Sequence, residues 1–283
     1  MRATRCICND ETIYHLEQRM REEEKSKATM EKYCHDVRAF LHYIGEEKVL
    51  SKELVITYKN YLGERYEVSS ANSMLAALNY FLRFIGREDC IVKSFRIQKE
   101  AFRSREQELT REEYLKLLEE ARKRGDERLY MIMQTICATG IRISELPFIT
   151  VASLQSRRAR VLLKGKTRTV LLPLELCNKL KNYAAKQGIE AGSVFVTRSG
   201  RPVDRSNIFH AMKKLCQNAE VAETKVYPHN LRHLFAVTFY KEERDICHLA
   251  DLLGHSNINT TRIYTLISCE EQERQLDSLC LCQ

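Results

Sequence analysis

Residues 228–264 read PHNLRHLFAVTFYKEERDICHLADLLGHSNINTTRIY, and their periodicity predicts a run of short helices. The opening proline suits the first turn of a helix. His229 and Arg232 are three positions apart, so at a helix start they lie on one face. We expect helices near the following ranges: 230–241, 245–253 and 259–266.

The end of the middle helix carries a signal of its own. Its apolar stripe stops at Gly254, a residue that lets the chain turn out of a helix. His255 follows directly, so its imidazole is expected at the end of an element and not in a core. Tyr264 comes nine residues later, on the short polar helix expected there.

Two further segments upstream combine basic residues with turns. The segment TGIRISEL, residues 139–146, places Arg142 after a glycine and three positions before Glu145. Residues 161–172, VLLKGKTRTVLL, form two β-type runs around a glycine-containing turn, which predicts a β-hairpin with lysines at its tip.

These residue types together suit chemistry on a phosphodiester. The transition state for attack on phosphorus concentrates negative charge on the non-bridging oxygens, which fixed cationic donors stabilise. Arg142 and Arg232 supply guanidiniums that bind phosphate oxygens in a planar fork. The imidazoles of His229 and His255 can donate hydrogen bonds or move protons near neutral pH. Tyr264 can store the bond energy as a phosphate ester.

The order of these elements resembles the tyrosine recombinase family, which includes phage integrases, Xer proteins and transposon integrases. That family combines T-G-x-R-x-x-E-L, a lysine on a β-hairpin, H-x-x-R, L-G-H and a tyrosine about nine residues later; all five occur here, in order, over roughly 107–270. The resemblance implies strand exchange on double-stranded DNA by a tetramer on paired sites, without a metal or nucleotide cofactor.

The resemblance also implies a role for each matching residue. Arg142 and Arg232 would hold the scissile phosphate, and Glu145 would orient Arg142. His229 would act in proton transfer and His255 would support the transition state. Tyr264 would attack phosphorus to give a 3′-phosphotyrosine and a free 5′ hydroxyl.

The general acid that protonates the departing 5′ oxygen is expected on the hairpin. The sequence K-G-K-T-R departs from the family's frequent G-K-G-x-K-x-R, so the alignment slips by one residue. Lys166 is favoured by its distance from Arg142 and by the Lys-Thr pair. Lys164 stays open, because strand residues two apart share a face.

The expected fold is mainly α with a small β-hairpin, in two domains. Residues 1–105 would form a helical domain like the family's core-binding domain, and 106–283 the catalytic domain with a tail helix. The boundary precedes Thr110, which with Glu113 matches the capping box that starts a helix. In the first domain, apolar periodicity and turn residues predict helices near the following ranges: 12–24, 30–44, 51–63 and 69–85.

Composition is consistent with an intracellular DNA-binding protein. The 283 residues carry a net charge of +8, of which 107–283 hold 27 basic against 21 acidic residues. Eleven cysteines, an odd number, favour reduced thiols and a cytoplasmic location. No apolar run approaches the ~20 residues that span a membrane. The C-x-C pairs at Cys6/Cys8 and Cys280/Cys282 leave a joint zinc site as a minor alternative.

Several alternatives stay open at this point. A type IB topoisomerase shares the phosphotyrosine chemistry, and a regulator with a degenerate recombinase fold would only bind DNA. A metal nuclease is disfavoured, because no carboxylate cluster suits paired magnesium ions. An integrase or excisionase of a mobile element is preferred over an Xer-like chromosome resolvase. The tail from 270 to 283 is expected to pack on its own domain or on a neighbouring protomer.

Overall fold

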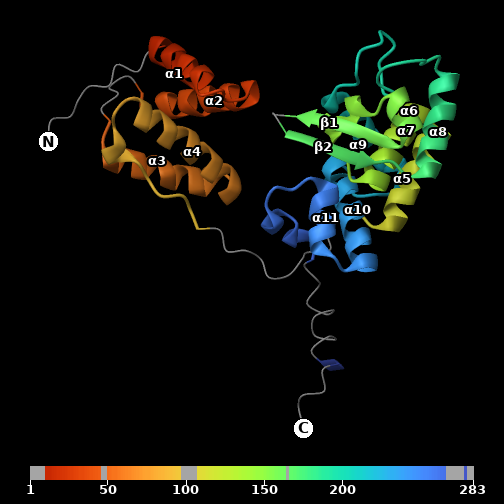
Figure 1. Cartoon of the computed structure of the whole chain (residues 1–283). Helices are drawn as coiled ribbons and strands as arrows, with labels where there is room; N and C mark the ends of the chain where they lie inside the picture. Colours follow the sequence, from red (N-terminus) through yellow and green to blue (C-terminus); the bar gives the residue numbers. More distant parts are fainter. Residues whose placement is uncertain (1–9, 46–49, 97–106, 164–165, 266–276, 279–283) are drawn as a thin grey trace. The chain divides into compact units, whose positions relative to one another are not determined.

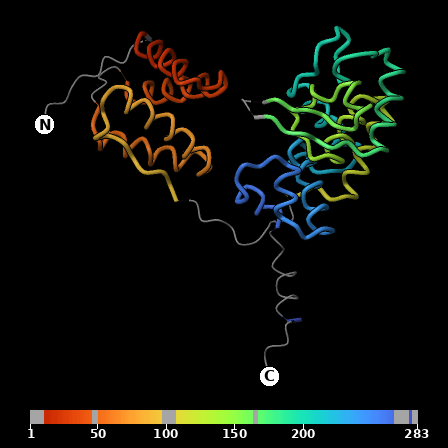
Figure 2. The backbone as a smooth tube through the Cα atoms, in the orientation of Figure 1, coloured from red at the N-terminus to blue at the C-terminus, as the bar shows by residue number. Residues whose placement is uncertain are grey.

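The computed structural model describes residues 10–45, 50–96, 107–163, 166–265 and 277–278 (Figure 1). The chain divides into two compact units, Met1–Lys99 and Glu100–Gln283 (Figure 2). The predicted boundary between residues 105 and 106 lies outside the described residues, and so do most of the expected linker and of the C-terminal tail. The domain limits therefore stay a prediction.

The first unit is a small helical bundle. Ser26 and Ser51 begin two of its helices by accepting hydrogen bonds from the backbone N–H of Thr29, at 3.2 Å, and of Leu54, at 3.1 Å. The fourth helix begins at Val68, slightly earlier than predicted. The elements are α1 (Asp10–Glu22), α2 (Lys27–Tyr43), α3 (Lys52–Arg65), α4 (Val68–Phe84) and η1 (Glu88–Cys90).

The second unit is mostly helical with one small sheet. The predicted capping box is confirmed, since Thr110 and Glu113 exchange side-chain-to-backbone hydrogen bonds at 2.8 and 3.1 Å. The helical elements are α5 (Arg111–Lys123), α6 (Glu127–Thr139), η3 (Ile143–Phe148), α7 (Val151–Ser156), α8 (Leu174–Lys186), α9 (Arg205–Ala219), η4 (Glu223–Lys225), α10 (Pro228–Glu243), α11 (Ile246–Leu253), η5 (Ile258–Thr260) and η6 (Arg262–Tyr264).

The predicted hairpin is confirmed as an antiparallel pair, β1 (Arg158–Leu163) and β2 (Lys166–Leu171). Alternate residues such as Val161 and Val170 are buried against the helices, whereas Leu162 is exposed. The tip at residues 164–165 lies outside the described part of the chain.

Helix α6 is central to the second unit. It packs against α5, α8, α9 and α10, and it is apolar around most of its circumference, as expected for a buried helix. Its C-terminal end leads directly into the segment that carries Arg142. The segment that carries Arg142 is therefore attached to a helix that packs against four others.

The last predicted helix is wrong. Residues 258–264 form two 3-10 turns, η5 and η6, in place of a helix over 259–266. The Asn257 side chain accepts a hydrogen bond from the N–H of Asn259 at 2.9 Å, which favours a turn. The β-branched pair Thr260 and Thr261 further disfavours a helix of this length.

None of the described helices is long and apolar enough to cross a membrane. The six cysteines in the described ranges are free thiols, four of them buried. Both terminal C-x-C pairs lie outside those ranges, so the zinc alternative stays untested. Elsewhere in the described part of the chain, no group of three or more His, Cys, Asp or Glu side chains could hold a metal ion.

Candidate active site

A left-handed glycine places Arg142. Helix α6 ends at Gly140, which has φ +62°. A Cβ there would lie 2.5 Å from Phe235 on α10 and 2.9 Å from Leu253 on α11. Only glycine allows both the turn and this close approach. The chain then leaves the helix and presents Arg142 at the start of η3.

Glu145 orients Arg142, as expected. Its carboxylate accepts hydrogen bonds from the Arg142 backbone N–H at 2.8 Å and from Arg142 Nη1 at 3.0 Å. Glu145 is only 1% exposed. Burial alone would raise its pKa, but the hydrogen bonds from Arg168 and from the Arg142 backbone lower the pKa below the usual value. The group is therefore a buried carboxylate, and the Arg142 side chain remains partly exposed beside it.

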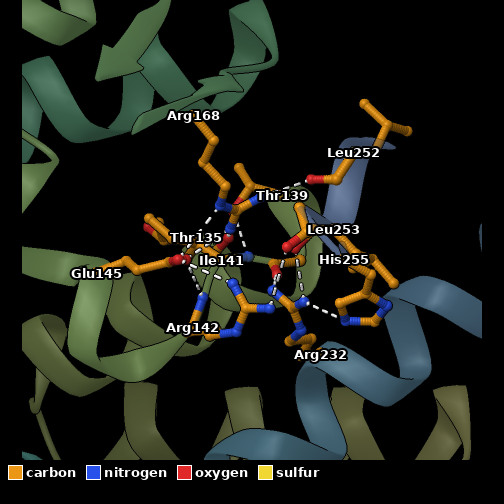
Figure 3. Close-up of polar contacts among 12 residues, drawn as sticks. Thr135, Thr139, Ile141, Arg142, Glu145, Arg168, Arg232, Leu252, Leu253 and His255 are labelled. Carbon is orange, nitrogen blue, oxygen red and sulfur yellow. Dashed lines mark hydrogen bonds and ion pairs between the residues drawn. The ribbon is translucent and has the colours of Figure 1, made fainter. Parts of the chain in front are cut away.

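Arg168, on β2, makes contacts in the site that the sequence did not predict. Its Nη2 and Nε donate to the two carboxylate oxygens of Glu145 at 2.5 and 3.2 Å, and its Nη1 donates to the Leu252 carbonyl at 2.7 Å (Figure 3). The same side chain passes so close to Gly254 that a Cβ there would clash with Arg168 Cδ. One guanidinium thus joins the hairpin, η3 and the end of α11.

Arg232, on α10, lies fully buried beside Arg142, with 1% of its surface exposed. It donates to the carbonyls of Gly140 and Leu253, the latter at 2.8 Å. Its Nε is buried without a hydrogen-bond partner among the described residues. Burial, with the nearby charge of Arg142, lowers its pKa to about 10, so it stays cationic at neutral pH.

His255 contacts Arg232 directly. Its Nε2 lies 3.0 Å from Arg232 Nη2, and its Nδ1 lies 2.9 Å from the Thr261 hydroxyl. Burial, followed by the charges of Arg232 and Arg142, lowers the pKa of His255 to about 4. The imidazole is therefore neutral at pH 7.

His229 lies at the rim of the site, in the first turn of α10. It lines a cavity of about 480 Å³ with Ile143, Phe209 and other residues. The residue is exposed overall, yet partial desolvation of its ring lowers its pKa, and the charges of Arg232 and Arg142 lower the pKa further. The same two arginines thus act on both histidines.

Tyr264 is next to these groups but is buried, with 3% of its surface exposed. Its ring stacks on His255 with centroids 6.3 Å apart and tilts against His233 at 5.1 Å. Ala236, Leu249 and Leu253 form an apolar cluster with it. The sequence did not predict this burial, because it placed Tyr264 on a polar helix.

The lysine remains the untested member of the set. Lys166 is the first residue of β2 and pairs with Leu163 across the hairpin. Lys164 lies outside the described residues. The structure therefore brings together Arg142, Arg232, His255 and Tyr264, with His229 at the rim.

Two supporting residues had only weak signals in the sequence. Arg168 belongs to the K-T-R run, in which only the lysine is predicted to have a role. Thr261 is one of two adjacent threonines, and nothing in the sequence distinguishes it from Thr260, although Thr261 is fully buried and Thr260 is exposed. Arg168 contacts segments that are distant in the chain, and Thr261 contacts His255 across a turn.

Comparison with known proteins gives the family to which the chain is similar. Residues 107–271 match the phage integrase family, and residues 15–89 match the phage integrase N-terminal SAM-like domain. The chain is 30% identical over 272 residues to the tyrosine recombinase XerA of Thermococcus kodakarensis, covering 92% of each protein.

Solved structures share the fold. XerH bound to its difH substrate, in a pre-cleavage complex, aligns with a TM-score of 0.70 and 18% identity over 94% of this chain and 84% of that one. A lambda integrase tetramer bound to a Holliday junction aligns with a TM-score of 0.71 and 16% identity over 90% and 76% of the two chains.

The chain belongs to the phage integrase family, the tyrosine recombinases. Its class of activity is site-specific DNA recombination by an enzyme that breaks and rejoins strands. The predicted family and fold class are confirmed.

Proposed function

We propose that this protein cuts and rejoins double-stranded DNA through a 3′-phosphotyrosine formed on Tyr264. The observation that carries the proposal is the convergence of Arg142, Arg232 and His255, which come from three separate segments and meet beside the Tyr264 ring. Two fixed cations next to a neutral imidazole and a phenol suit attack on a phosphodiester.

The two arginines form the phosphate seat. Arg142 keeps about a third of its side chain exposed (37%) while Glu145 holds its orientation. Arg232 retains an Nε that has no partner among the described residues, and a phosphate oxygen would satisfy it. Repulsion between two neighbouring guanidiniums also falls when a dianionic transition state lies between them.

His255 is the better placed of the two imidazoles to receive the phenol proton. Arginine has no acceptor atom, so the His255 Nε2 that faces Arg232 must carry a lone pair. In the step we propose, Arg232 turns its Nη2 from Nε2 to the phosphate, the Tyr264 oxygen bonds to phosphorus, and its proton passes to the freed Nε2. The bond to the 5′ oxygen breaks, and that oxygen takes a proton from the general acid. His229 acts at the rim as a second hydrogen-bonding group.

Lys166 supplies the proton to the departing 5′ oxygen. Strand residues two apart share a face, and Arg168 on the same strand reaches Glu145 at the centre of the site. Lys166 begins β2 two positions before Arg168, and this place on the strand supports the choice of Lys166. Lys164 remains the alternative, and a 5′-thio substrate separates the two.

Tyr264 must leave its apolar cluster to react. Transfer of a side chain of this size to water costs about 2 kcal/mol, which leaves roughly 3% of molecules with the phenol out. The 3-10 turns that carry it are short, so few hydrogen bonds are broken. DNA binding would offset this cost, because the exposed phenol then has a phosphate to attack.

The partners follow from the family. We propose that the substrate is a pair of recombination sites in double-stranded DNA and that the working assembly is a tetramer. The support is the similarity to lambda integrase, which was solved as a tetramer on a Holliday junction. We also propose a cytoplasmic location, which DNA as substrate and the free cysteines of the described residues support. The preference for a mobile element stays a prediction that the DNA flanking the gene can test.

A nicked suicide substrate tests the reaction. Wild type should form a protein–DNA adduct on a denaturing gel, and Tyr264→Phe should form none while still binding DNA. Tyr240→Phe is the matched control, because Tyr240 packs against the same apolar cluster. An adduct from Tyr264→Phe would remove Tyr264 from the role, and relaxation of plasmid lacking any site would favour a topoisomerase.

A further inference from the structure

Thr261 makes two contacts, one with each of the two reactive residues His255 and Tyr264. Its hydroxyl lies 2.9 Å from His255 Nδ1, and its side chain is fully buried. Its backbone carbonyl accepts the N–H of Tyr264 at 2.9 Å, which starts the turn that presents the phenol. A single residue thus contacts the imidazole with its side chain and the tyrosine with its backbone.

The direction of the side-chain hydrogen bond can be worked out from its neighbours. Arg232 Nη2 faces His255 Nε2 at 3.0 Å, and a guanidinium can only donate. Nε2 therefore accepts, which leaves the single proton of the neutral ring on Nδ1. The Nδ1–H then donates to the Thr261 oxygen.

We propose that Thr261 is a positioning residue for strand cleavage: its buried hydroxyl accepts the Nδ1–H of His255 and, together with Arg232 at Nε2, holds the ring in one tautomer and one orientation beside the phosphate seat. The inference rests on the proposed role of His255 as acceptor of the phenol proton. A base held by a third group in one tautomer is a recurring arrangement in enzymes that activate a hydroxyl nucleophile.

The contact is specific to the hydroxyl and not to the space that Thr261 fills. Valine has nearly the same shape, so Thr261→Val removes only the hydrogen bond and leaves the His255 Nδ1–H buried without an acceptor. Thr261→Ser keeps the hydroxyl. Thr260→Val is the matched control, because Thr260 is adjacent and exposed.

The first measurement is the tautomer of His255 in the DNA-free protein. Nitrogen-15 shifts of histidine-labelled protein distinguish protonated from unprotonated ring nitrogens, and the His255→Gln variant assigns the signal. Wild type, Thr261→Ser and Thr260→Val should show Nδ1–H alone. Thr261→Val should lose this single state, because the buried Nδ1–H then has no acceptor and the ring is held by Arg232 at one nitrogen only. An unchanged tautomer in Thr261→Val overturns the proposal.

The second measurement is the rate of adduct formation on the suicide substrate. Thr261→Val should be slower by about 10- to 100-fold, the effect of one buried N–H left without an acceptor. Thr261→Ser and Thr260→Val should stay near the wild-type rate. A wild-type rate for Thr261→Val, or a slow rate with an unchanged tautomer, overturns the positioning role.

Failure of the proposed function would look different. If wild type forms no adduct, or if His255→Gln cleaves normally, the proposed chemistry is wrong. The tautomer measurement needs no DNA, so it still decides whether Thr261 holds the ring of His255.

Discussion

Replacement of Arg168 by methionine removes the side chain that joins three active-site segments. Methionine keeps most of the volume and loses the two hydrogen bonds to Glu145 and the one to the Leu252 carbonyl. Glu145 would then be a carboxylate that is 1% exposed, and among the described residues Arg142 would be its remaining ion-pair partner.

The structure sets the size of the effect. Removal of one partner from a buried ion pair costs about 3–5 kcal/mol, because the other charge stays in a poorly solvated place. Arg142 continues to pair with Glu145, so we expect Arg168→Met to lower the free energy of unfolding by about 3 kcal/mol, the lower end of that range. Adduct formation should also slow, since both Arg142 and the end of α11 lose a fixed neighbour.

Urea unfolding of the full chain is monitored by hydrogen exchange of peptides from α6 and α10. These peptides give the free energy of unfolding of the second unit alone. A double-mutant cycle with Glu145→Gln should show a coupling of about 2 kcal/mol or more, because the double variant no longer leaves the Glu145 carboxylate buried without Arg168. A loss below about 1 kcal/mol in Arg168→Met, or strictly additive losses, would refute the reasoning.

Three further outcomes are expected. Gly140→Ala should destabilise the second unit by about 1–3 kcal/mol more than Gly125→Ala in the same assay, because both have positive φ but only Gly140 meets side chains at that position; equal losses would contradict this. The pKa of His255 is lowered to about 4 in the folded state, so the unfolded chain binds the proton first, and stability should fall as pH drops from about 6.5 toward 4; His255→Gln should flatten this part of the urea-midpoint profile, and an unchanged profile would contradict the assignment. A 5′-thio leaving group should restore cleavage to Lys166→Ala and not to Lys164→Ala, and equal behaviour would leave the choice of Lys166 unsupported.

The local signals in the sequence predicted much of the second unit. The capping box at Thr110, the hairpin of residues 161–172 and the end of α11 at Gly254 each depend on neighbouring residues, so a single sequence contains them. The positions of Arg142 and Arg232 followed from the same kind of signal, because each lies at the start of a helical element.

The remaining features depend on contacts that no local pattern encodes. Arg168 is a strand residue whose importance comes from Glu145, 23 positions away, and from Leu252, 84 positions away. The polar sequence around Tyr264 suggested an exposed helix, whereas the side chain fills a gap between α10 and α11. Helix propensity was outweighed there by turn-forming side chains and by burial of one aromatic ring.

In the proposed reaction, the phosphate seat delivers DNA to one phenol, that of Tyr264. Proteolysis of the trapped protein–DNA adduct, followed by mass spectrometry, identifies the attached residue among the 13 tyrosines of the chain. We expect a 3′-phosphate ester on Tyr264 alone. Attachment to any other residue, or through a 5′ phosphate, would contradict it.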